Sequence, residues 1–155
     1  MTPVDWPAVA AIYADGIATG SATFETEVPS WESWDAGHLP APRPVAVETG
    51  DVVGWAAVSR VSQRDCYRGV VEHSVYVASS HRGRGIGRAL LDDLIAAAPA
   101  HGIWTIQTSI FATNEPSLAL HRRCGFRDVG RRERIAQRDG IWHDTVLMEL
   151  RLSDS

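Results

Sequence analysis

The chain contains no lysine, and all 15 of its basic residues are therefore arginines. This absence excludes Schiff-base chemistry on a lysine, and it excludes a lysine anchor for pyridoxal phosphate. Cysteine is also scarce, since Cys66 and Cys124 are the only two and lie far apart in the sequence. Two isolated cysteines are typical of proteins from a reducing compartment, so we expect the protein to be cytoplasmic.

Long apolar runs are missing as well. No stretch approaches the roughly 18 residues that indicate a membrane-spanning helix, and the first residues lack the basic start and apolar core of a secretory signal. We therefore expect no membrane association. The net charge of −4 argues against nucleic acid as the main partner. With 155 residues and 45% hydrophobic content, the chain is expected to form a single domain, residues 1–155, with a sizeable core.

Charge is distributed unevenly along the chain. Residues 1–81 hold 4 arginines against 10 acidic residues, a net charge of −6. Residues 82–155 hold 11 arginines against 9 acidic residues, a net charge of +2. An anionic ligand would therefore favour the second half of the chain, which also carries the most informative motif.

That motif is the glycine-rich stretch Arg82-Gly83-Arg84-Gly85-Ile86-Gly87. It lies between an apolar run at 74–77, typical of a strand, and an amphipathic run that continues to about residue 98, typical of a helix. Glycines let the backbone approach an anion closely, and the N–H groups in the first turn of a helix are free to bind it. The arginines of the stretch, together with Arg88, add positive charge. We interpret the stretch as a pyrophosphate-binding turn, and a surface turn without a ligand is the alternative.

Two familiar nucleotide-binding motifs do not fit this turn. A Gly-x-Gly-x-x-Gly pattern would need its third glycine at position 88 or 90, where the chain has Arg88 and Leu90. A phosphate-binding loop of the Gly-Lys-Ser/Thr type needs the lysine that the chain lacks. The pattern that remains is Arg-x-x-Gly-x-Gly.

Periodicity and turn residues predict alternating helices and strands, with no repeat or linker. A Thr-Pro start predicts a first helix from about residue 3, and Trp31 and Trp34 lie on a predicted short helix. Further predicted elements are strands at 45–48 and 52–59 that form a hairpin, a strand at 70–77, a helix at 85–98, a strand at 104–111, a helix at 114–123, and short strands at 133–137 and 145–151. This order predicts a layered α/β domain with a mixed sheet.

The strand at 72–77, the glycine-rich turn and the pattern Asn114-x-x-Ser117-x-x-Leu120-His121-x-x-Cys124-Gly125-Phe126 together resemble the GNAT superfamily of N-acetyltransferases over nearly the whole chain. More narrowly, residues 21–26, 71–77 and 140–144 are similar to the phosphinothricin and methionine sulfone (sulfoximine) acetyltransferase branch. The resemblance implies a GNAT-like α/β fold with a mixed, mostly antiparallel central sheet flanked by helices. Because the first helix starts at about residue 3, we expect the first strand of the family to be short or absent.

The resemblance also implies acetyl transfer from acetyl-CoA to the primary amine of a small molecule, and a homodimer with the C-terminal strands as its interface. It implies that the pantetheine arm pairs with the backbone of Val75, Tyr76 and Val77, and that Asn114 binds this arm with Ser117 nearby. The pyrophosphate is then expected on the turn that comprises Arg82, Gly83, Arg84, Gly85, Ile86, Gly87 and Arg88. No metal is expected, because no set of His, Cys and acidic residues has the spacing of metal ligands.

An amine attacks a thioester only as the free base, so a base must remove its proton. Glu72 is the candidate general base, because it is a carboxylate in an otherwise apolar strand beside the segment expected to pair with pantetheine. The alternative is that Glu72 faces water or pairs with Arg68. His73 alternates with Glu72 along the strand, so we expect it to face the other way in a structural role.

His121 stands where many superfamily members carry a tyrosine that protonates the leaving thiolate, and the phosphinothricin branch shares the histidine. As a catalytic residue it could deprotonate the amine, orient the substrate or donate to the thiolate. The alternative is a structural histidine at a helix end. A backbone N–H near Val75 is expected to stabilise the oxyanion. No covalent acyl-enzyme is implied, and Cys124 is expected to pack in the fold.

The acceptor amine needs a pocket of its own. Phe24, Trp31 and Trp34 lie where the acceptor loop of the family falls, and they either line this pocket or pack in the core. Arg64 or Arg68 could clamp acidic groups of the substrate, and the alternative is that both are solvated in a loop. His143 is assigned to the substrate pocket, with packing as its alternative.

Three functions remain open from the sequence. The first is N-acetylation of a small amino-acid-like amine such as phosphinothricin, methionine sulfone or methionine sulfoximine. The second keeps the fold but acts on a protein N-terminus, a polyamine or an aminoglycoside, and the acidic first half of the chain would suit a cationic acceptor. The third is a catalytically silent domain that binds acyl-CoA or a partner protein. The presence of Glu72 and Asn114 favours an enzyme.

Overall fold

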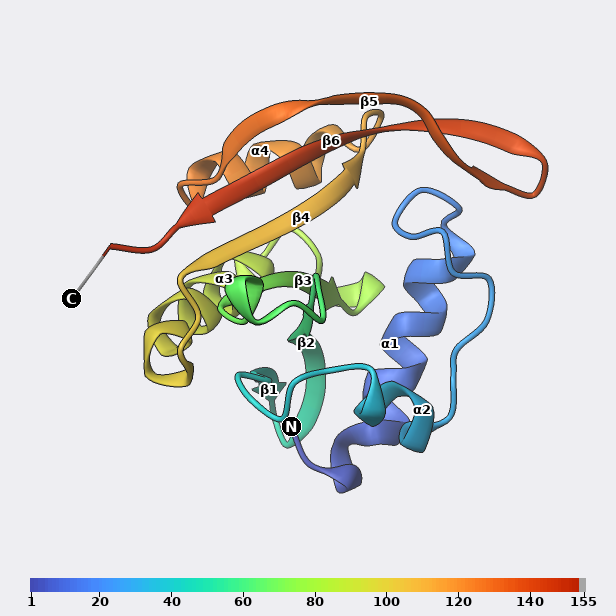
Figure 1. Cartoon of the computed structure of the whole chain (residues 1–155). Helices are drawn as coiled ribbons and strands as arrows, with labels where there is room; N and C mark the ends of the chain where they lie inside the picture. The colour runs from blue at the N-terminus through green and yellow to red at the C-terminus, as the bar shows by residue number, and fades with distance from the viewer. Residues whose placement is uncertain (154–155) are drawn as a thin grey trace.

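The computed structural model of the chain describes residues 1–153. Six strands form one sheet in the order β1-β2-β3-β4-β6-β5 (Figure 1). Their bounds are Val45–Glu48 (β1), Asp51–Arg60 (β2), Val70–Val77 (β3), Thr105–Phe111 (β4), Arg127–Arg138 (β5) and Ile141–Arg151 (β6). Among these strands only β3 and β4 pair in parallel, so the expected mixed, mostly antiparallel sheet is confirmed.

The α-helices that accompany the sheet are α1 (Trp6–Ala18), α2 (Trp31–Ala36), α3 (Ile86–Ala97) and α4 (Glu115–Arg123). A short 3-10 turn, Pro3–Asp5, leads into α1, and the Thr2 N–H donates to the Asp5 carboxylate at 2.7 Å. Within residues 1–153 no strand precedes α1. This confirms the expectation that the first strand of the family is short or absent in this chain. None of the helices described is both long enough and apolar enough to span a membrane.

Both faces of β2 are covered, and residues 53–58 of this strand are all buried. Alternate side chains of a strand point to opposite faces of its sheet. Ala56 and Val58 belong to a core cluster that includes side chains of α3, whereas Trp55 and Ala57 belong to a second cluster that includes side chains of α1. The helices α1 and α3 therefore cover opposite faces of the sheet.

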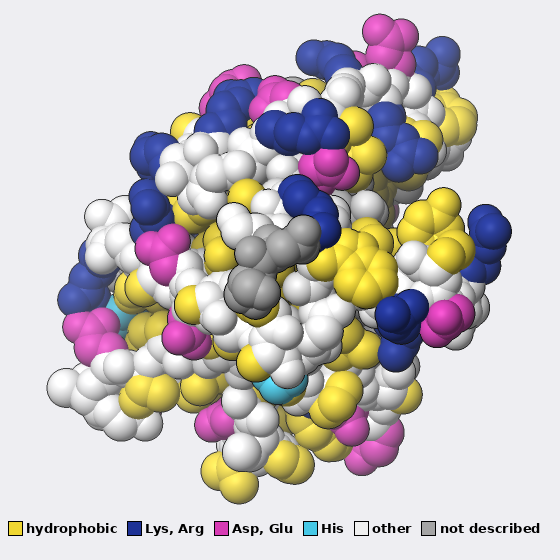
Figure 2. Space-filling model, turned by 60° about the vertical axis from the view of Figure 1, so that its left-hand side comes forward, with side chains coloured by type: hydrophobic (Ala, Val, Ile, Leu, Met, Phe, Trp, Pro, Cys, Tyr) yellow, Lys and Arg dark blue, Asp and Glu magenta, His cyan; other side chains and the backbone are white. Residues whose placement is uncertain are grey.

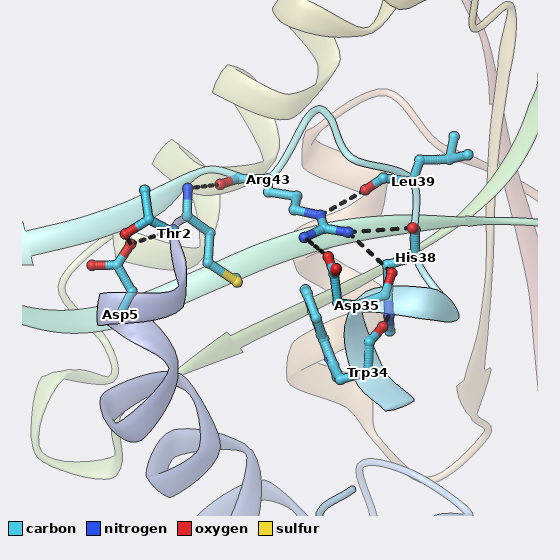
Figure 3. A network of polar contacts seen from close by, with 8 residues as sticks. Thr2, Asp5, Trp34, Asp35, His38, Leu39 and Arg43 are labelled. Carbon is cyan, nitrogen blue, oxygen red and sulfur yellow. Dashed lines mark hydrogen bonds and ion pairs between the residues drawn. The ribbon is translucent and has the colours of Figure 1, made fainter. Parts of the chain in front are cut away.

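The second cluster contains the two tryptophans, Trp31 and Trp34, that the sequence places near the acceptor loop. Trp34 is 2% exposed and packs on Trp55 with 5.6 Å between ring centroids, and Trp31 stacks on Trp34 at 5.8 Å. Arg43 holds the loop after α2 in place, since its guanidinium donates to the Asp35 carboxylate at 2.5 Å and to three backbone carbonyls (Figure 3). Trp31 and Trp34 therefore pack in the core and do not form the acceptor pocket.

The C-terminal hairpin is longer than the sequence predicts. Short strands are predicted at 133–137 and 145–151, but β5 and β6 have 12 and 11 residues. The predicted lengths are wrong because two bulges interrupt the alternation of β5, whose side chains are mostly exposed. Arginine and acidic side chains lie side by side in this region, at the top of Figure 2, and one such pair joins Arg131 to Asp144 at 2.6 Å.

Candidate active site

Strands β3 and β4 are neighbours over only part of their length. The pairing joins residues 70–72 with residues 105–107, and beyond Glu72 the described strands no longer pair with each other. From there β3 continues beside β2 and β4 continues beside β6, so the two strands diverge. A cavity of about 760 Å³ lies in this fork. Its walls come from both strands, the loop after α1, the turn before α3 and one side of α4.

The glycine-rich turn, residues 81–88, forms what we name the turn side of the cavity. Gly83 and Gly85 have φ angles of +74° and +79°, in the left-handed region that L side chains rarely adopt. Helix α3 begins directly after Gly85, so the free N–H groups of its first turn belong to this side. The lining residues here are His81, Arg82, Gly83, Gly85, Ile86, Gly87 and Arg88. Backbone donors and two arginines therefore share one wall, where the Arg88 Nε–H also donates to the Asp92 carboxylate at 3.0 Å, and this wall suits a diphosphate.

Two arginines near the turn side depart from the sequence-based assignment. Arg84 is not a lining residue, because its guanidinium binds the Glu48 carboxylate at 2.6 and 3.1 Å and so ties the turn to the β1–β2 hairpin. Arg123, which sequence reasoning missed, lines the cavity from the end of α4. The sequence does hold one signal for Arg123. It follows His121 by two residues, in the last turn of the helix that opens onto the cavity.

The segment assigned to pantetheine lies on the open part of β3. The lining residues include Val75, Tyr76 and Val77 from β3 and Asn114 and Ser117 from α4. The Asn114 side-chain oxygen accepts from the Ser117 N–H at 3.3 Å and so caps α4 at the cavity wall. The edge of β3 that faces away from β2 has no strand partner here among the described residues, so its backbone groups can pair with an extended ligand.

Glu72 lies at the point where β3 and β4 separate. It is half-buried and lines the cavity, and its carboxylate accepts from the Gln107 side-chain amide at 3.4 Å. The alternative pairing with Arg68 does not occur, because the Arg68 guanidinium lies 3.4 Å from the Asp65 carboxylate. A carboxylate next to the open edge of β3 can accept a proton from an amine held in the cavity.

His121 and His73 form a buried pair that sequence reasoning missed, because the two residues are 48 positions apart. Their Nε2 atoms lie 3.0 Å apart, and His121 Nδ1 lies 2.6 Å from the Ser117 carbonyl oxygen. A carbonyl only accepts, so Nδ1 of His121 carries the proton and its Nε2 accepts from the Nε2–H of His73. His73 is buried, and although its alternation with Glu72 predicts that it faces the other way, both histidine rings border the cavity that Glu72 also lines.

Burial also fixes the charge of this pair. Desolvation lowers the pKa of His121, and desolvation together with the neighbouring His121 lowers the pKa of His73 to about 3. Both rings are therefore neutral near pH 7. In the part of the chain described, no three or more His, Cys, Asp or Glu side chains are grouped so that they could hold a metal ion.

The loop after α1, residues 19–25, forms what we name the loop side of the cavity. Phe24 lines it and packs on Phe111 with 4.6 Å between ring centroids. His143 does not line the cavity but stacks on Phe111 at 4.8 Å, so it takes the packing alternative. Glu25, which sequence reasoning missed, is also a lining residue.

The structure does not bring Arg64 and Arg68 to the cavity. Both lie in the exposed turn before β3, where Arg64 stacks over the Tyr67 ring at 5.6 Å and Arg68 over the Trp104 ring at 5.3 Å. The cavity wall on β3 begins only at Glu72. These positions give no support to their assignment as a clamp on the substrate.

Comparison with known proteins gives concordant matches. The profile of the Acetyltransferase (GNAT) family matches residues 8–126. The chain is 38% identical over 156 residues to the phosphinothricin N-acetyltransferase of Alcaligenes faecalis, covering 94% of this chain and 77% of that protein. It is 33% identical over 154 residues to the L-methionine sulfoximine/L-methionine sulfone acetyltransferase of Pseudomonas aeruginosa, and the match covers 96% of this chain and 90% of that protein. A solved phosphinothricin acetyltransferase from Sinorhizobium meliloti, in complex with AcCoA, has a TM-score of 0.87 at 32% identity, covering 98% of this chain and 85% of that chain.

Proposed function

Since the chain belongs to the acetyltransferase (GNAT) family and is an N-acetyltransferase, we propose that its acceptor is a small amino acid analogue of the phosphinothricin, methionine sulfone or methionine sulfoximine type. One observation carries this proposal. Relatives named for these acceptors match 94% and 96% of the chain at 38% and 33% identity.

Acetyl-CoA, the acetyl donor, is proposed to lie along the cavity with its pyrophosphate on the turn side. The N–H groups that follow Gly85 and the guanidinium groups of Arg82 and Arg88 suit its two phosphates. The pantetheine arm then pairs with the open edge of β3 at residues 75–77, and Asn114 and Ser117 face it from α4. This arrangement brings the thioester towards the fork, where Glu72 lies.

In the proposed reaction, Glu72 removes a proton from the substrate ammonium group, and the free amine attacks the thioester carbonyl carbon directly. As the C–N bond forms, the carbonyl oxygen becomes an oxyanion, which a backbone N–H near Val75 stabilises. The C–S bond then breaks with its electron pair on sulfur. The nitrogen, which carries a surplus proton after the attack, releases that proton, and the thiolate takes it up, which gives free CoA and the neutral N-acetylated product.

His121 is proposed to support this reaction by its position and not as a proton donor. Its Nδ1 proton is held by the Ser117 carbonyl, and the lone pair of Nε2 receives the proton of His73. Donation to the thiolate would break one of these buried hydrogen bonds. The same arrangement leaves the Ser117 hydroxyl without a base, because the nearest ring nitrogen is itself a donor. Direct attack on acetyl-CoA is therefore favoured over a covalent acyl-serine.

Thiol release from acetyl-CoA, measured over a panel of amines, tests the acceptor assignment. We expect kcat/KM for the best of phosphinothricin, methionine sulfone and methionine sulfoximine to exceed that for polyamines, aminoglycosides and peptide N-termini by about 100-fold or more. A cationic amine that equals or exceeds the three analogues would contradict the assignment.

A cationic amine is the second candidate acceptor, because Glu25 and Glu72 both line the cavity. The same panel of amines distinguishes a cationic acceptor from the amino acid analogues. A catalytically silent acyl-CoA-binding domain, the third possibility from the sequence, predicts calorimetric binding of CoA without thiol release from any amine in the panel.

We also propose that the protein is a cytoplasmic homodimer that uses the C-terminal hairpin. Four apolar side chains of this hairpin are 42–63% exposed, namely those of Val129, Ile135, Ile141 and Trp142. Burying them against a second copy would remove apolar surface from water. Light scattering on the eluting protein should give twice the mass of the chain, and Trp142→Arg should shift the protein towards the monomer.

A further inference from the structure

One arginine of the C-terminal hairpin differs from its neighbours in burial and in partners. Arg138, the last residue of β5, has a side chain that is 10% exposed, whereas those of Arg127 and Arg131 are 67% and 60% exposed. Those two arginines pair with acidic side chains at the surface. The Arg138 Nε also lies 3.7 Å from the carboxylate of the adjacent Asp139, but its hydrogen bonds go to backbone carbonyls that lie 115 and 121 residues away in the sequence.

The Arg138 guanidinium connects α1 to the loop side of the cavity. Its Nη1 donates to the Thr23 carbonyl at 2.8 Å, and its Nη2 donates to the Ile17 carbonyl at 2.6 Å. Ile17 lies in the last turn of α1, where the carbonyls carry the negative end of the helix dipole and favour a guanidinium, and its carbonyl also accepts from the Gly20 N–H. Figure 1 shows the far end of the β5–β6 hairpin extending over this loop. One planar group therefore fixes the loop relative to the helix before it.

Most other polar connections of the loop side join it to residues close by in the sequence, and its start is tied to the end of α1 by the Thr19 hydroxyl and two backbone N–H groups. Two of its N–H groups donate to threonine hydroxyls at 3.1 and 3.3 Å, and both bonds are local. Phe24 is held by its ring contact with Phe111. The loop is thus anchored at Phe24 by an apolar contact, at the Thr23 side chain by hydrogen bonds with Tyr13 and Tyr76, and at the Thr23 backbone carbonyl by Arg138.

We propose that Arg138 is a positioning residue for the acceptor amine, because it holds the loop side of the cavity in the shape that binds the acceptor. This inference rests on the proposed function: acetyl-CoA there takes the turn side and the open edge of β3, which leaves the loop side of the cavity for the acceptor amine. Arg138 does not line the cavity, so it acts through the loop and does not touch the substrate. Burying a guanidinium carries a desolvation cost, which the two charge-assisted hydrogen bonds offset.

Kinetics of matched variants test the effect on the acceptor. Arg138→Met keeps the apolar stem but removes both donors, and Arg127→Met is the control in the same strand. We expect R138M to raise the KM for the acceptor about 10- to 100-fold, with a calorimetric Kd for acetyl-CoA within about twofold of the wild-type value. Arg138→Lys keeps the charge but lacks the planar guanidinium, so its KM for the acceptor should lie between the values for the wild type and R138M. R127M should match the wild type in both quantities.

Hydrogen exchange of the free enzyme separates this inference from the choice of acceptor. In R138M the amides of residues 19–25 should exchange faster while those of the turn side stay unchanged, and this measurement needs no substrate. Unchanged exchange at 19–25 would overturn the anchoring role. Faster exchange with an unchanged KM, measured with whichever amine the wild type acetylates best, would overturn the role in acceptor binding. If R138M does not fold, hydrogen exchange and the acceptor KM are measured on R138K instead, and the same outcomes support or overturn the inference.

Discussion

The turn side and the loop side of the cavity are built in different ways. The turn side comes from consecutive residues between β3 and α3, and its ligand-binding groups are backbone N–H groups and neighbouring arginines. The loop side takes its shape from partners far away in the sequence, since Phe24 packs on Phe111 and Arg138 binds the Thr23 carbonyl. One side is thus set by local structure and the other by tertiary contacts. Changes on one side should therefore leave ligand binding on the other side intact.

The largest effect is expected at Glu72, where the two sides meet. Glu72→Gln keeps the size and the hydrogen bond from Gln107 but removes the base, so kcat should fall by about 10²–10⁴-fold. The Kd for acetyl-CoA, measured by calorimetry, should stay at the wild-type value. Glu133→Gln, at an exposed position on β5, is the control. A kcat for E72Q close to that of the wild type would remove Glu72 from the mechanism.

The buried histidine pair predicts how stability depends on pH. The pKa of His73 is lowered to about 3 and that of His121 is lowered as well, so below about pH 6.5 the unfolded chain binds protons that the folded chain does not. The free energy of unfolding should therefore fall as the pH decreases, by roughly 1.4 kcal/mol per pH unit from His73 alone. Urea unfolding at pH 7, 6 and 5 measures this slope.

In His73→Phe the slope between pH 6 and pH 5 should be smaller by about that amount, whereas His101→Gln, at an exposed position, should keep the wild-type slope. Equal slopes in H73F and the wild type would mean that His73 is not held neutral by the fold.

Gly85→Ala tests the turn side alone. Its φ of +79° costs a residue with a Cβ atom about 1–2 kcal/mol, and nothing lies within 4 Å of the added methyl group, so strain in the turn is the main consequence. We expect the calorimetric Kd for CoA to rise about 10-fold and the KM for the acceptor to stay unchanged. A rise in the acceptor KM of similar size would show that the two sides are coupled.

Phe24→Ala is the reciprocal test on the loop side. It removes the ring contact with Phe111, which is worth about 0.5–1.5 kcal/mol beyond the buried area, so the acceptor KM should rise roughly fivefold. The Kd for CoA should not change. A weaker affinity for CoA with an unchanged acceptor KM would reverse the assignment of the two sides.

The contrast between local and tertiary structure also explains what the sequence could predict. The strand at 70–77 and the helix ending at Arg123 were predicted with their observed bounds or within a residue, because an apolar strand pattern, the Asn114 cap and Gly125 are local signals. The glycine-rich turn was recognisable for the same reason. The length of β5 could not be predicted from the sequence, because two bulges interrupt the alternation of its side chains.

Most candidate site residues predicted from local motifs line the cavity, and the exceptions are residues whose side chains tertiary contacts hold elsewhere. Arg84 carries a favourable position in the motif, but Glu48 from another strand holds its side chain away. The place of Arg64 and Arg68 before β3 predicts a contact with the substrate, yet the Tyr67 and Trp104 rings and the Asp65 carboxylate hold their side chains. The pairing of His73 with His121 has no signature along the chain, because only the packing of α4 on β3 creates it.

Strand β5 also has a bearing on how the protein behaves when concentrated. It lies at the edge of the sheet, and a long, regular edge strand offers unpaired backbone groups to which other chains can add. Here bulges fall between Asp128 and Gly130 and between Arg132 and Ala136, and five of the 12 residues are arginines. Irregular backbone and repelling charge make this edge a poor template for further strands. The features that obscure β5 in the sequence thus protect the folded protein against open-ended aggregation.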